Sequence, residues 1–598
     1  MPVLSLKVVL TLFLGICVAA NVPVISYVTR PDILTPNLTF TSFDRTKVTP
    51  VHVDKAKGLE PGYIFLSTYK GAAQHAPYIF DNQGNLVWSG YDSTLSDIGY
   101  FDFQSHRTSN SSLLSVFRGY ADSGRGKGHV AFLDQEYKTV RTLDAPAPLT
   151  SLDFHEFQLL DDGQTAIVTS LQPIQADLAA YGINETMGWL LDSAFYVLEL
   201  QRDNQIVFEW RSSDHIPLNE SAVTPSIGFG AGLSYGYAYD YFHLNSIARF
   251  QNGDYLLSAR HTNTLYRIAG TTGKVLWRLG GPQSSFTQDR FNFSSQHDAR
   301  ILHESSDGTI VLSLFDNAHN GIVGTNGATN TTSSALILSL DERKMTAYPV
   351  EQYFLPPHEG STAARALGSI QRLPNGNSLV SWGYLNTITE FAPGGHPLLN
   401  IAFNDEDAAH YRVHKGNWTA SPPVSELAVY VFAPDATQNT HIYISWNGAT
   451  EVRAWRVYGT ILTNFGGSET DEIGLFLGQL NKTGFETHFD AKRFVTSAWV
   501  SAIDIEGNVL GKSEVMKTIV PREEVRERCG KTHCVKQILM QEAEAKWGSG
   551  PVCAGSVAGG VESTVVGLWL YVQTFVFFLL GMGVNTMFSM RATPWWRW

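Results

Sequence analysis

The 598-residue chain has few cysteines, few charged residues and almost no long helical periodicity in its body. Charged residues make up 17% of the sequence, the formal net charge is −13, and no basic cluster is present. This balance disfavours nucleic acid or an anionic membrane surface as a partner, because neither would be attracted by bulk electrostatics. The weak helical periodicity between Pro61 and about Phe403, where short alternating segments are broken by Gly, Asn and Asp, predicts an all-β fold.

The four cysteines support a single disulfide and no metal centre. Cys17 lies in an apolar leader, which leaves Cys529, Cys534 and Cys553. One disulfide and one unpaired thiol are expected in an oxidising compartment, with the pairing undecided. His533 lies beside two of these thiols, but two thiols and one imidazole are an incomplete set for structural zinc, so we predict no metal.

Long apolar runs occur only near the two ends of the chain. Val8 to Ala20 follows a short segment with Lys7, and small residues end it, which predicts a signal peptide over residues 1–20. An uncleaved anchor is the alternative. Eight Asn-x-Ser/Thr sequons agree with a secretory route and are candidate glycosylation sites. They are Asn37, Asn110, Asn184, Asn219, Asn292, Asn330, Asn417 and Asn481.

The second apolar run, Val565 to Met590, carries no charge and is long enough to cross a bilayer. Arg591 and Arg597 follow it, which predicts a transmembrane helix over 563–590 and a cytosolic tail over 591–598. The protein is therefore expected to be a single-pass type I membrane protein with an extracellular or luminal body. A lipid-anchor signal is the alternative, with small residues at 554–556, but the polar, Trp-rich tail disfavours it.

Four segments of the body share one design: a polar residue, an alternating strand, a Gly turn and a return strand that ends in polar groups. Three of the four open on histidine. They are His155 to Ser170, His243 to His261, His297 to Asn317, and Ser369 to Trp382. Hairpins built this way bring their first residue to the same edge of each unit.

Other strands complete about six such units. Asp81–Trp88, Gln205–Trp210 and Thr271–Trp277 each read as a turn that feeds an outer strand ending in Trp. Four-stranded units repeated about six times predict a six-bladed β-propeller, with a pair of β-sandwiches as the alternative. The predicted order is an N-terminal extension over 21–60, the propeller over 61–405, a small β-sandwich of the Ig or fibronectin III kind over 420–518, and a charged stalk over 519–562.

Hairpin register predicts which residues gather. His243 should lie opposite Arg260 to Thr262, His297 beside Phe315 to His319, and His155 near Ser170. The ends of these hairpins approach the central channel of a propeller, so His155, His243, Arg260 and His297 can converge. A histidine at a strand start is ordinarily a hydrogen-bonded cap. A zinc triad is a further alternative, but Arg260 disfavours it because a cation raises the cost of placing a metal ion. The set suits an anionic substrate better.

The same residues carry a resemblance to a known family. The matching segments are Asp240-Tyr-Phe-His243-Leu-Asn-Ser, Leu257-Ser-Ala-Arg260-His261-Thr-Asn, Ser294-Ser-Gln-His297-Asp-Ala, Leu314-Phe-Asp-Asn317 and Ser445-Trp-Asn-Gly-Ala-Thr450. In this order they resemble signature segments of the PAPS-independent arylsulfotransferase family, in its eukaryotic membrane-anchored branch. The chain differs from the family by lacking the bacterial amino-terminal domain and by having Gln-His-Asp where Gln-His-Thr is usual.

The resemblance implies a six-bladed propeller that moves a sulfuryl group from an aryl sulfate to a phenolic acceptor without a cofactor. It implies that His297 is transiently sulfated and that His243, Arg260 and His155 assist. Chemistry adds Asp316 or Asn317 as a group that orients His297, and His261 as a further supporting residue. The alternatives are a non-catalytic cell-surface propeller that binds an anionic ligand or glycan, and a structural protein that interacts through the sandwich.

Overall fold

The structure is a computed structural model that describes residues 40–43 and 51–523, except for 71, 73, 96–97, 123, 184–186, 319–331, 357–361, 404–408 and 464–470. The chain divides into two compact units, Met1–Ile519 and Val520–Trp598, and nearly all described residues belong to the first. The predicted signal peptide, transmembrane helix, tail and most of the stalk lie outside the described residues. So do Cys529, Cys534, Cys553, Asn37, Asn184 and Asn330.

The transmembrane prediction is not tested by the structure. Over the described residues, no helix combines the length and the apolar character needed to cross a bilayer.

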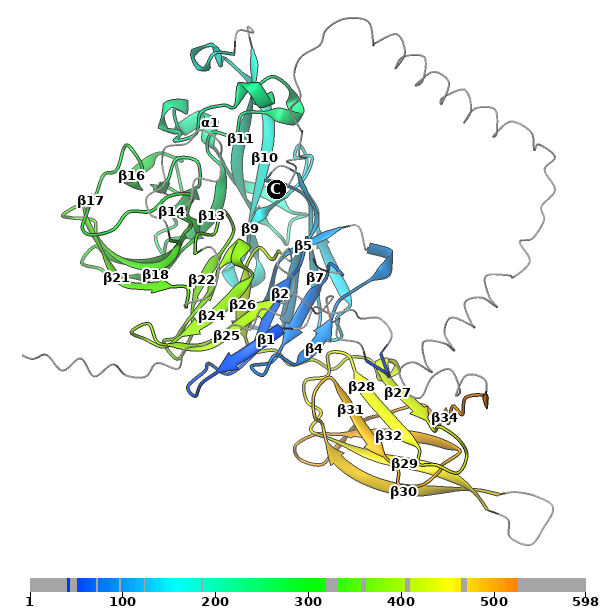
Figure 1. Cartoon of the computed structure of the whole chain (residues 1–598). Coiled ribbons are helices and arrows are strands. Elements are labelled where there is room, and N and C mark those ends of the chain that lie inside the picture. Colours follow the sequence, from blue (N-terminus) through cyan, green and yellow to red (C-terminus); the bar gives the residue numbers. More distant parts are fainter. Residues whose placement is uncertain are drawn as a thin grey trace, which may run out of the picture. The chain divides into compact units, whose positions relative to one another are not determined.

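Six sheets of four or five strands account for most of the described residues before Trp418 (Figure 1). From inner to outer strand, the first sheet contains β26 (Val413–Gly416), β2 (Tyr63–Ser67), β3 (Pro77–Phe80) and β4 (Leu86–Ser89). The second sheet contains β5 (Gly99–Arg107), β6 (Ser112–Asp122), β7 (Arg125–Leu133) and β8 (Thr139–Leu143). The next two are β9 (Asp153–Leu160), β10 (Thr165–Ala176), β11 (Gly188–Glu199), β12 (Gln205–Arg211), and β13 (Leu244–Arg249), β14 (Tyr255–Ala259), β15 (Thr264–Ile268), β16 (Val275–Gly280). The last two are β18 (His297–Glu304), β19 (Thr309–Asp316), β20 (Ser334–Asp341), β21 (Thr346–Phe354), β17 (Thr287–Gln288), and β22 (Ser369–Arg372), β23 (Ser378–Ser381), β24 (Thr387–Phe391), β25 (Pro397–Phe403), β1 (Val51–Lys55).

The inner strands of these sheets contact one another in a closed cycle. The order is β26, β5, β9, β13, β18, β22 and back to β26. Every pairing within a sheet is antiparallel except that of β17 with β21. A closed cycle removes the exposed sheet edges that an open arrangement would leave.

Two strands extend this region beyond the predicted range of 61–405. β1 pairs with β25 on the outer side of the last sheet, and β26 supplies the inner strand of the first sheet by pairing with β2. Neither strand belongs to a hairpin with its partner, so local turn signals could not reveal them. The first sheet is therefore built from both ends of the region.

Burial follows position within a sheet. Every residue of β14, the second strand of its sheet, is buried, and its sequence, Tyr-Leu-Leu-Ser-Ala, is nearly all apolar. The outer strand β12 alternates between exposed and covered residues, and its Trp210 is buried. The outer strands β4 and β16 likewise carry buried tryptophans, Trp88 and Trp277. The tryptophan of each of these three outer strands is thus buried, as expected when alternate residues of a strand face the interior.

The described residues after Trp418 form two smaller sheets. One contains β27 (Leu427–Phe432), β28 (His441–Trp446) and β31 (Glu486–Asp490). The other contains β30 (Asp471–Asn481), β29 (Ala454–Thr463), β32 (Ser497–Ile503), β33 (Val509–Lys512) and β34 (Met516–Lys517). Both sheets contribute to one apolar core that includes Ile444 and Val457. The only α-helix among the described residues is α1 (Ser212–His215), so the all-β prediction is confirmed.

Candidate active site

The hairpins place the predicted histidines at the ends of the inner strands. Leu244 pairs with Ala259, and the Arg260 amide donates to the His243 carbonyl at 3.0 Å. His297 pairs with Phe315. The predicted neighbours of His243 and His297 are therefore confirmed.

His155 lies in an irregular stretch of its strand. Asp153 pairs with Thr169, Phe157 pairs with Val168, and the register shifts between these two pairs. Residues 154–156 thus bulge from the ladder, and His155 has no partner in it, whereas the sequence predicted a place near Ser170. A bulge adds a residue that arithmetic on turn positions cannot show.

Irregular backbone turns each histidine out of the regular strand. His243 has a φ of 56°, and Asp298, directly after His297, has a φ of 54°. Registers also shift next to both residues. Positive φ in a residue other than glycine is costly, and the surrounding structure must hold it in place. Here positive φ occurs at the predicted site residue His243 and directly after the predicted site residue His297.

Three imidazoles are packed together in the interior. The ring centroids of His155 and His243 are 4.9 Å apart with the rings nearly perpendicular, and those of His243 and His261 are 4.6 Å apart. All three side chains are buried. The predicted convergence of His155 and His243 is thus present in the structure.

A carboxylate holds the Nδ1 atom of two of these rings. Asp153 Oδ2 lies 2.6 Å from His155 Nδ1, and Asp240 Oδ2 lies 2.5 Å from His243 Nδ1. Burial opposes ionisation of Asp240, but the neighbouring His243 and His261 hold the pKa of its carboxyl well below the ordinary value. A carboxylate at Nδ1 places a proton on that atom, so Nε2 is the atom that can exchange a proton with a ligand. At His243 burial outweighs the effect of Asp240 and lowers the pKa of the ring below its ordinary value.

His261 orients Arg260. The His261 Nδ1–H group donates to the Asp240 carbonyl at 2.6 Å, so the unprotonated Nε2 accepts a hydrogen bond from Arg260 Nη1 at 2.8 Å. Burial lowers the pKa of His261 to about 3, so this ring stays neutral. Arg260 Nη2 also donates to the Arg365 carbonyl at 3.1 Å. Burial lowers the pKa of Arg260 to about 10, which leaves the guanidinium charged at neutral pH.

His297 has an amide partner instead of a carboxylate. Its Nδ1–H group donates to Asn317 Oδ1 at 2.6 Å. Asn317 Nδ2 donates to the carbonyls of Ala364 and Leu367, both at 3.0 Å. These two bonds fix which end of the amide faces the ring, so the proton of His297 is assigned to Nδ1 and the Nε2 lone pair is free.

His297 is also held in its neutral form. Burial lowers the pKa of His297 well below the ordinary value, and the positive charge of Arg260 lowers it further. His243 and His155 lower the pKa of His297 as well. A buried neutral imidazole with a free lone pair and a cation nearby is suited to attack an electrophile that carries negative charge.

Asp316 does not perform the role predicted for it as an alternative to Asn317. Its Oδ1 accepts hydrogen bonds from the amides of Ser294 at 2.9 Å and Ala318 at 2.8 Å. The carboxyl therefore fixes the backbone at Ser294 and Ala318. Of the two predicted residues, it is Asn317 whose side chain hydrogen-bonds the ring of His297. Burial raises the pKa of Asp316 to about 7.

Two polar residues of the recognised segments join the strands that carry the histidines. Asn245 Nδ2 donates to the Gln296 carbonyl at 2.6 Å, and the Ala299 amide donates to Ser246 Oγ at 2.9 Å. Gln296 Nε2 in turn donates to the Ala259 carbonyl at 3.0 Å. The polar residues beside His243 and His297 thus lock one sheet to the next.

Sequence reasoning missed Asp153 and Asp240 as partners of the histidines. Each lies two or three residues before its histidine. That spacing is the signal that could have found them, because a short irregular segment can return a carboxylate to the following ring. Arg412, discussed below, had no such signal.

One group in the described residues has the composition of a metal site: Asp240, His243 and His261. Both nitrogens of His261 are already committed, one to a carbonyl and one to Arg260. A divalent ion would have to displace Arg260 or lie beside its charge. The donor set therefore suits proton chemistry better than metal binding.

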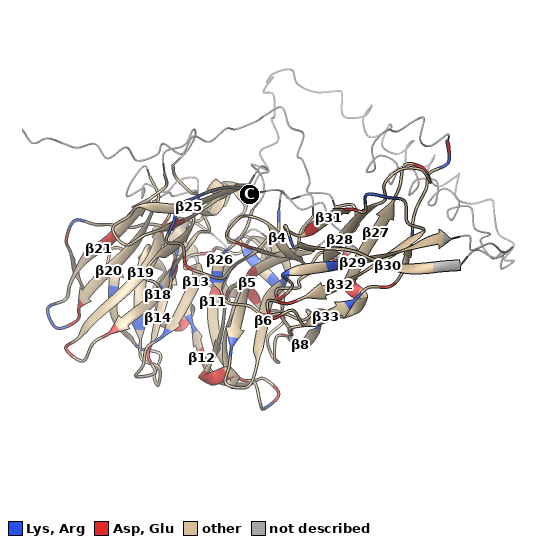
Figure 2. Ribbon diagram, turned by 90° about the horizontal axis from the view of Figure 1, so that it is seen from below, with Lys and Arg blue, Asp and Glu red and all other residues tan. Residues whose placement is uncertain are grey.

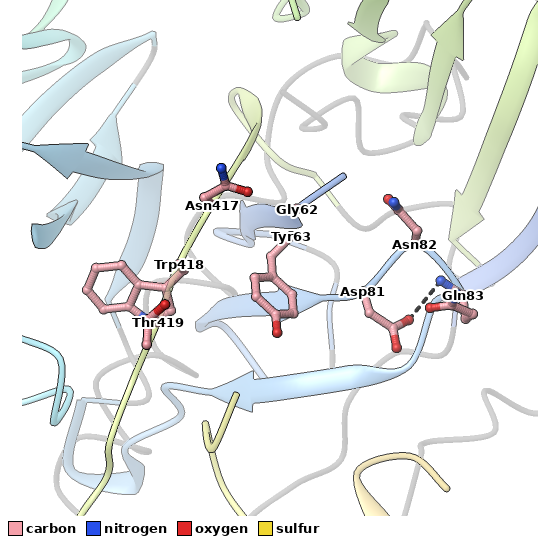
Figure 3. A pocket seen from close by; sticks show the side chains of 8 residues that line it. All are labelled: Gly62, Tyr63, Asp81, Asn82, Gln83, Asn417, Trp418 and Thr419. Atoms are coloured by element: carbon pink, nitrogen blue, oxygen red, sulfur yellow. Dashed lines mark hydrogen bonds between the residues drawn. The ribbon is translucent and has the colours of Figure 1, made fainter. Parts of the chain in front are cut away.

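A surface pocket lies elsewhere and contains none of these residues (Figure 3). Tyr63 and Asp81 line it together with Asn417 and Trp418, as well as Gly62, Asn82, Gln83 and Thr419. The side chain of Asn417 is exposed, as glycosylation would require. The lining offers no cation for an anionic substrate.

The fold and the site together define an all-β protein with a buried cluster of imidazoles and one guanidinium. Residues 104–404, half of the chain, match the family described as Arylsulfotransferase (ASST). The chain therefore belongs to the arylsulfotransferase family, and membership supports an arylsulfotransferase activity at the level of the family. No curated protein matches the chain.

Solved structures give only weak likenesses. A protein of unknown function from Bacteroides caccae is 11% identical with a TM-score of 0.33, and the match covers 60% of this chain and 99% of that one. Hydrazine synthase from Kuenenia stuttgartiensis is 11% identical with a TM-score of 0.28 and coverages of 53% and 70%. An inactive variant of virginiamycin B lyase from Staphylococcus aureus is 11% identical with a TM-score of 0.26 and coverages of 71% and 96%. Likenesses this weak say nothing about function.

Proposed function

We propose that this protein is a six-bladed propeller enzyme that moves a sulfuryl group from an aryl sulfate ester to a phenolic acceptor through a sulfated His297. The six sheets joined in a cycle are the blades in this proposal. One observation carries it: Asn317 holds the Nδ1 proton of a buried, neutral His297 and leaves its Nε2 unprotonated. A group that only binds an anion would do so better as a cation.

The first displacement transfers the group to the enzyme. His297 Nε2 attacks the sulfur atom of the donor, an N–S bond forms, and the bond between sulfur and the aryl oxygen breaks. The electron pair of that bond leaves with the phenolate oxygen, which takes a proton from His155 Nε2. Asp153 Oδ2 accepts the Nδ1 proton of His155, which leaves Nε2 as the atom that exchanges this proton.

The second displacement regenerates the enzyme. The hydroxyl of the acceptor gives its proton to His155 Nε2 and its oxygen attacks the sulfur atom. The N–S bond breaks, and its electron pair returns to His297. No external proton donor or nucleotide is needed, because the proton taken up in the second step replaces the one lost in the first.

Arg260 and the protonated form of His243 would stabilise the charge on the sulfuryl oxygens. A sulfuryl group in transfer carries negative charge on its peripheral oxygens, as a phosphoryl group does. Arg260 is held in place by His261, and His243 by Asp240, so neither group must reorganise during the reaction. Each well-placed donor contributes on the order of 3 kcal/mol to such a transition state.

A chromogenic aryl sulfate tests the proposal on the purified body of the protein. A burst of phenol should accompany a mass increase of one sulfuryl group on the peptide that contains His297. His297→Ala should abolish both signals. His303→Ala is the matched control, because His303 is an exposed histidine of the same strand, β18, and should leave both unchanged. The absence of phenol release and of the adduct in the wild type would refute the proposal.

The second candidate function is that of a cell-surface propeller that binds an anionic ligand or glycan without turnover. The buried Arg260 favours it, because a fixed guanidinium also suits a bound sulfate. Under this alternative His297→Ala would weaken ligand binding, and no variant would affect a reaction. Under the enzyme proposal the variant retains binding and loses turnover.

We also propose that the chain is a glycosylated type I membrane protein of the membrane-anchored branch, with its body extracellular or luminal. The five described sequon asparagines, Asn110, Asn219, Asn292, Asn417 and Asn481, are all exposed. Exposure is what an oligosaccharide requires. Treatment of the protein from a eukaryotic host with an N-glycosidase should lower its apparent mass, and loss of residues 563–598 should release it into the medium.

Acceptor choice is assigned to the segment between β12 and β13. Gly124, at the tip of the β6–β7 hairpin, lies so near the His243 ring that an added Cβ would be 3.2 Å from Cε1. Its neighbour Arg125 donates to the Gly236 carbonyl at 2.9 Å. The exposed Tyr235 and Tyr237 flank Gly236, so this contact brings two aromatic side chains to the region beside His243. Aromatic faces there are suited to hold an aryl acceptor.

A further inference from the structure

Arg412 is a buried arginine directly before the closing strand β26, and 1% of its side chain is exposed. Its Nη2 donates to the carbonyl of His155 at 2.8 Å and to the carbonyl of Asn245 at 2.9 Å. The hydroxyl of Tyr411 donates to the same two carbonyls, at 3.1 Å and 3.3 Å. The two residues before β26 therefore hold the strand of His155 and the strand that follows His243.

The same guanidinium reaches the residue after His297. Arg412 Nε lies 3.3 Å from Asp298 Oδ1. Asp298 Oδ2 accepts the amide of Ile370 at 3.1 Å, so this carboxylate is fixed on its other side. One arginine thus contacts His155 itself, a residue two positions from His243 and a residue adjacent to His297.

Further carboxylates complete the surroundings of the arginine. Arg412 Nη1 lies 3.1 Å from Asp102 Oδ2 and 3.3 Å from Glu156 Oε1. Arg300 contacts Glu156 at 2.9 Å and Asp298 at 2.7 Å. Figure 2 shows red and blue segments where β5 and β26 lie, within a ribbon that is mostly tan. Charges as deeply buried as these remain in a protein only when they are paired and hydrogen-bonded.

The fork of a guanidinium is required for this arrangement. Five N–H groups in a plane can serve two carbonyls and three carboxylates from different strands at once. A lysine ammonium has the same charge but a single centre, so it cannot reach all of these partners. The partners of Arg412 lie on the four strands β5, β9, β13 and β18, so this one side chain joins four inner strands.

We propose that Arg412 is a positioning residue that fixes the spacing between His155, His243 and His297, and that Asp298 is its partner for His297. The inference rests on the proposed function, because spacing between these rings matters only if they act on one group. It also explains why an aspartate follows His297 in this chain where the family usually has threonine. The carboxylate of Asp298 balances the buried guanidinium of Arg412 and the partly buried one of Arg300, which a threonine could not do.

Arg412→Lys tests the inference against Lys415→Met. Lys415 is a second buried cation three residues further along the chain, within β26, and it pairs with Glu390 at 2.6 Å. Its partners Gln371 and Glu390 lie on the sheet of β22 and β24, which carries none of the three histidines. Both variants lose a buried cation contact, so both should melt at a lower temperature than the wild type. Kinetics are then compared at a temperature at which both are folded.

The expected result is a split between rate and affinity. The rate of the phenol burst should fall about 100-fold in Arg412→Lys, because a shift of about 1 Å between reacting groups has that effect. The KM for the donor should change less than about threefold, and Asp298→Asn should show a smaller loss of rate. Lys415→Met should retain the wild-type burst. A wild-type burst in folded Arg412→Lys, or an equal loss in Lys415→Met, would overturn the inference.

A second readout separates this inference from the proposed function. Diethyl pyrocarbonate carbethoxylates unprotonated imidazole, and peptide mass spectrometry gives the rate at His297 without any sulfate ester. Arg412→Lys should change this rate relative to the wild type, whereas Lys415→Met should not. If the wild type shows no burst, the proposed function fails, and the modification rates still decide whether Arg412 positions the rings. Equal rates in all three proteins would refute that role.

Discussion

Three buried histidines of the site fall into two kinds according to the group that holds Nδ1. His155 and His243 each have a carboxylate partner, whereas His297 has the amide of Asn317. A carboxylate supports the imidazolium form, and an amide oxygen accepts the proton without adding charge. In the proposed mechanism this difference separates the tasks of the rings: proton transfer and charge stabilisation for His155 and His243, nucleophilic attack for His297.

The largest effect on the rate of transfer should come from replacing one histidine of each kind, in separate variants, by glutamine. His297→Gln should lower the rate of transfer on the order of 10⁵- to 10⁶-fold, as the loss of a nucleophile does in other enzymes. His155→Gln should lower it only about 10²- to 10⁴-fold, the range for a general acid or base. Donors with a series of leaving phenols distinguish the roles. The His155 variant should lose most with the most basic phenolates, because these need the proton.

Asn317→Asp should convert the amide-held ring into a carboxylate-held one. In the proposed mechanism the neutral form of His297 is the active one. A carboxylate raises the pKa of the ring, so the fraction of neutral His297 at a given acidic pH falls. In the wild type, His297 has a strongly lowered pKa and should not limit the rate near pH 6. The acid limb of the burst rate should move about 1 to 3 pH units upward in the variant. An unchanged profile would show that Asn317 does not set the protonation of His297.

Asp316 is a buried carboxyl whose Oδ1 accepts hydrogen bonds from two backbone amides. Burial raises its folded pKa to about 7, above the ordinary value of 3.8. Its contribution to stability is thus complete below pH 3.8 and is lost as pH rises through 7, because the unfolded chain releases the proton more readily. The free energy of unfolding should fall by about 2 kcal/mol between pH 5 and pH 8 on account of this group. Asp316→Asn, measured by urea unfolding, should remove that part of the pH dependence.

The smallest effect should arise at the exposed aromatic residues. Tyr235→Ala should raise the KM for a bulky phenolic acceptor about fivefold, since an aromatic contact contributes about 1 kcal/mol. The burst rate with a small donor should remain unchanged. Tyr348→Ala, an equally accessible tyrosine on the outer strand β21, is the control and should alter neither value. Equal effects of both changes would remove Tyr235 from acceptor recognition.

Much of the fold could be predicted because hairpins form between neighbouring segments and depend on local sequence patterns. The hairpins that begin at His155, His243, His297 and Ser369 occur where turn glycines and alternation place them. The strands β1 and β26 could not be predicted, because each pairs with a strand hundreds of residues away or outside its own hairpin. Nothing in a local pattern encodes such a partner.

The site shows the same division. Register placed Arg260 beside His243 and Phe315 beside His297 because hairpin pairing is local. The choice between Asp316 and Asn317 could not be made from sequence. Alternate residues of a strand face opposite sides, and a bulge can exchange them. Arg412 was missed altogether, since its five partners come from four separate strands.

The position of β26 has a consequence for the order in which the protein is made. The strand follows all the others of the ring in the chain, yet it is the inner strand of the first sheet. While a ribosome is still synthesising the chain, the carbonyls of His155 and Asn245 have no guanidinium to bind until Arg412 has emerged. A nascent chain therefore cannot complete the contacts around these histidines early, and a gene fragment intended to encode the whole ring of sheets must extend past codon 416.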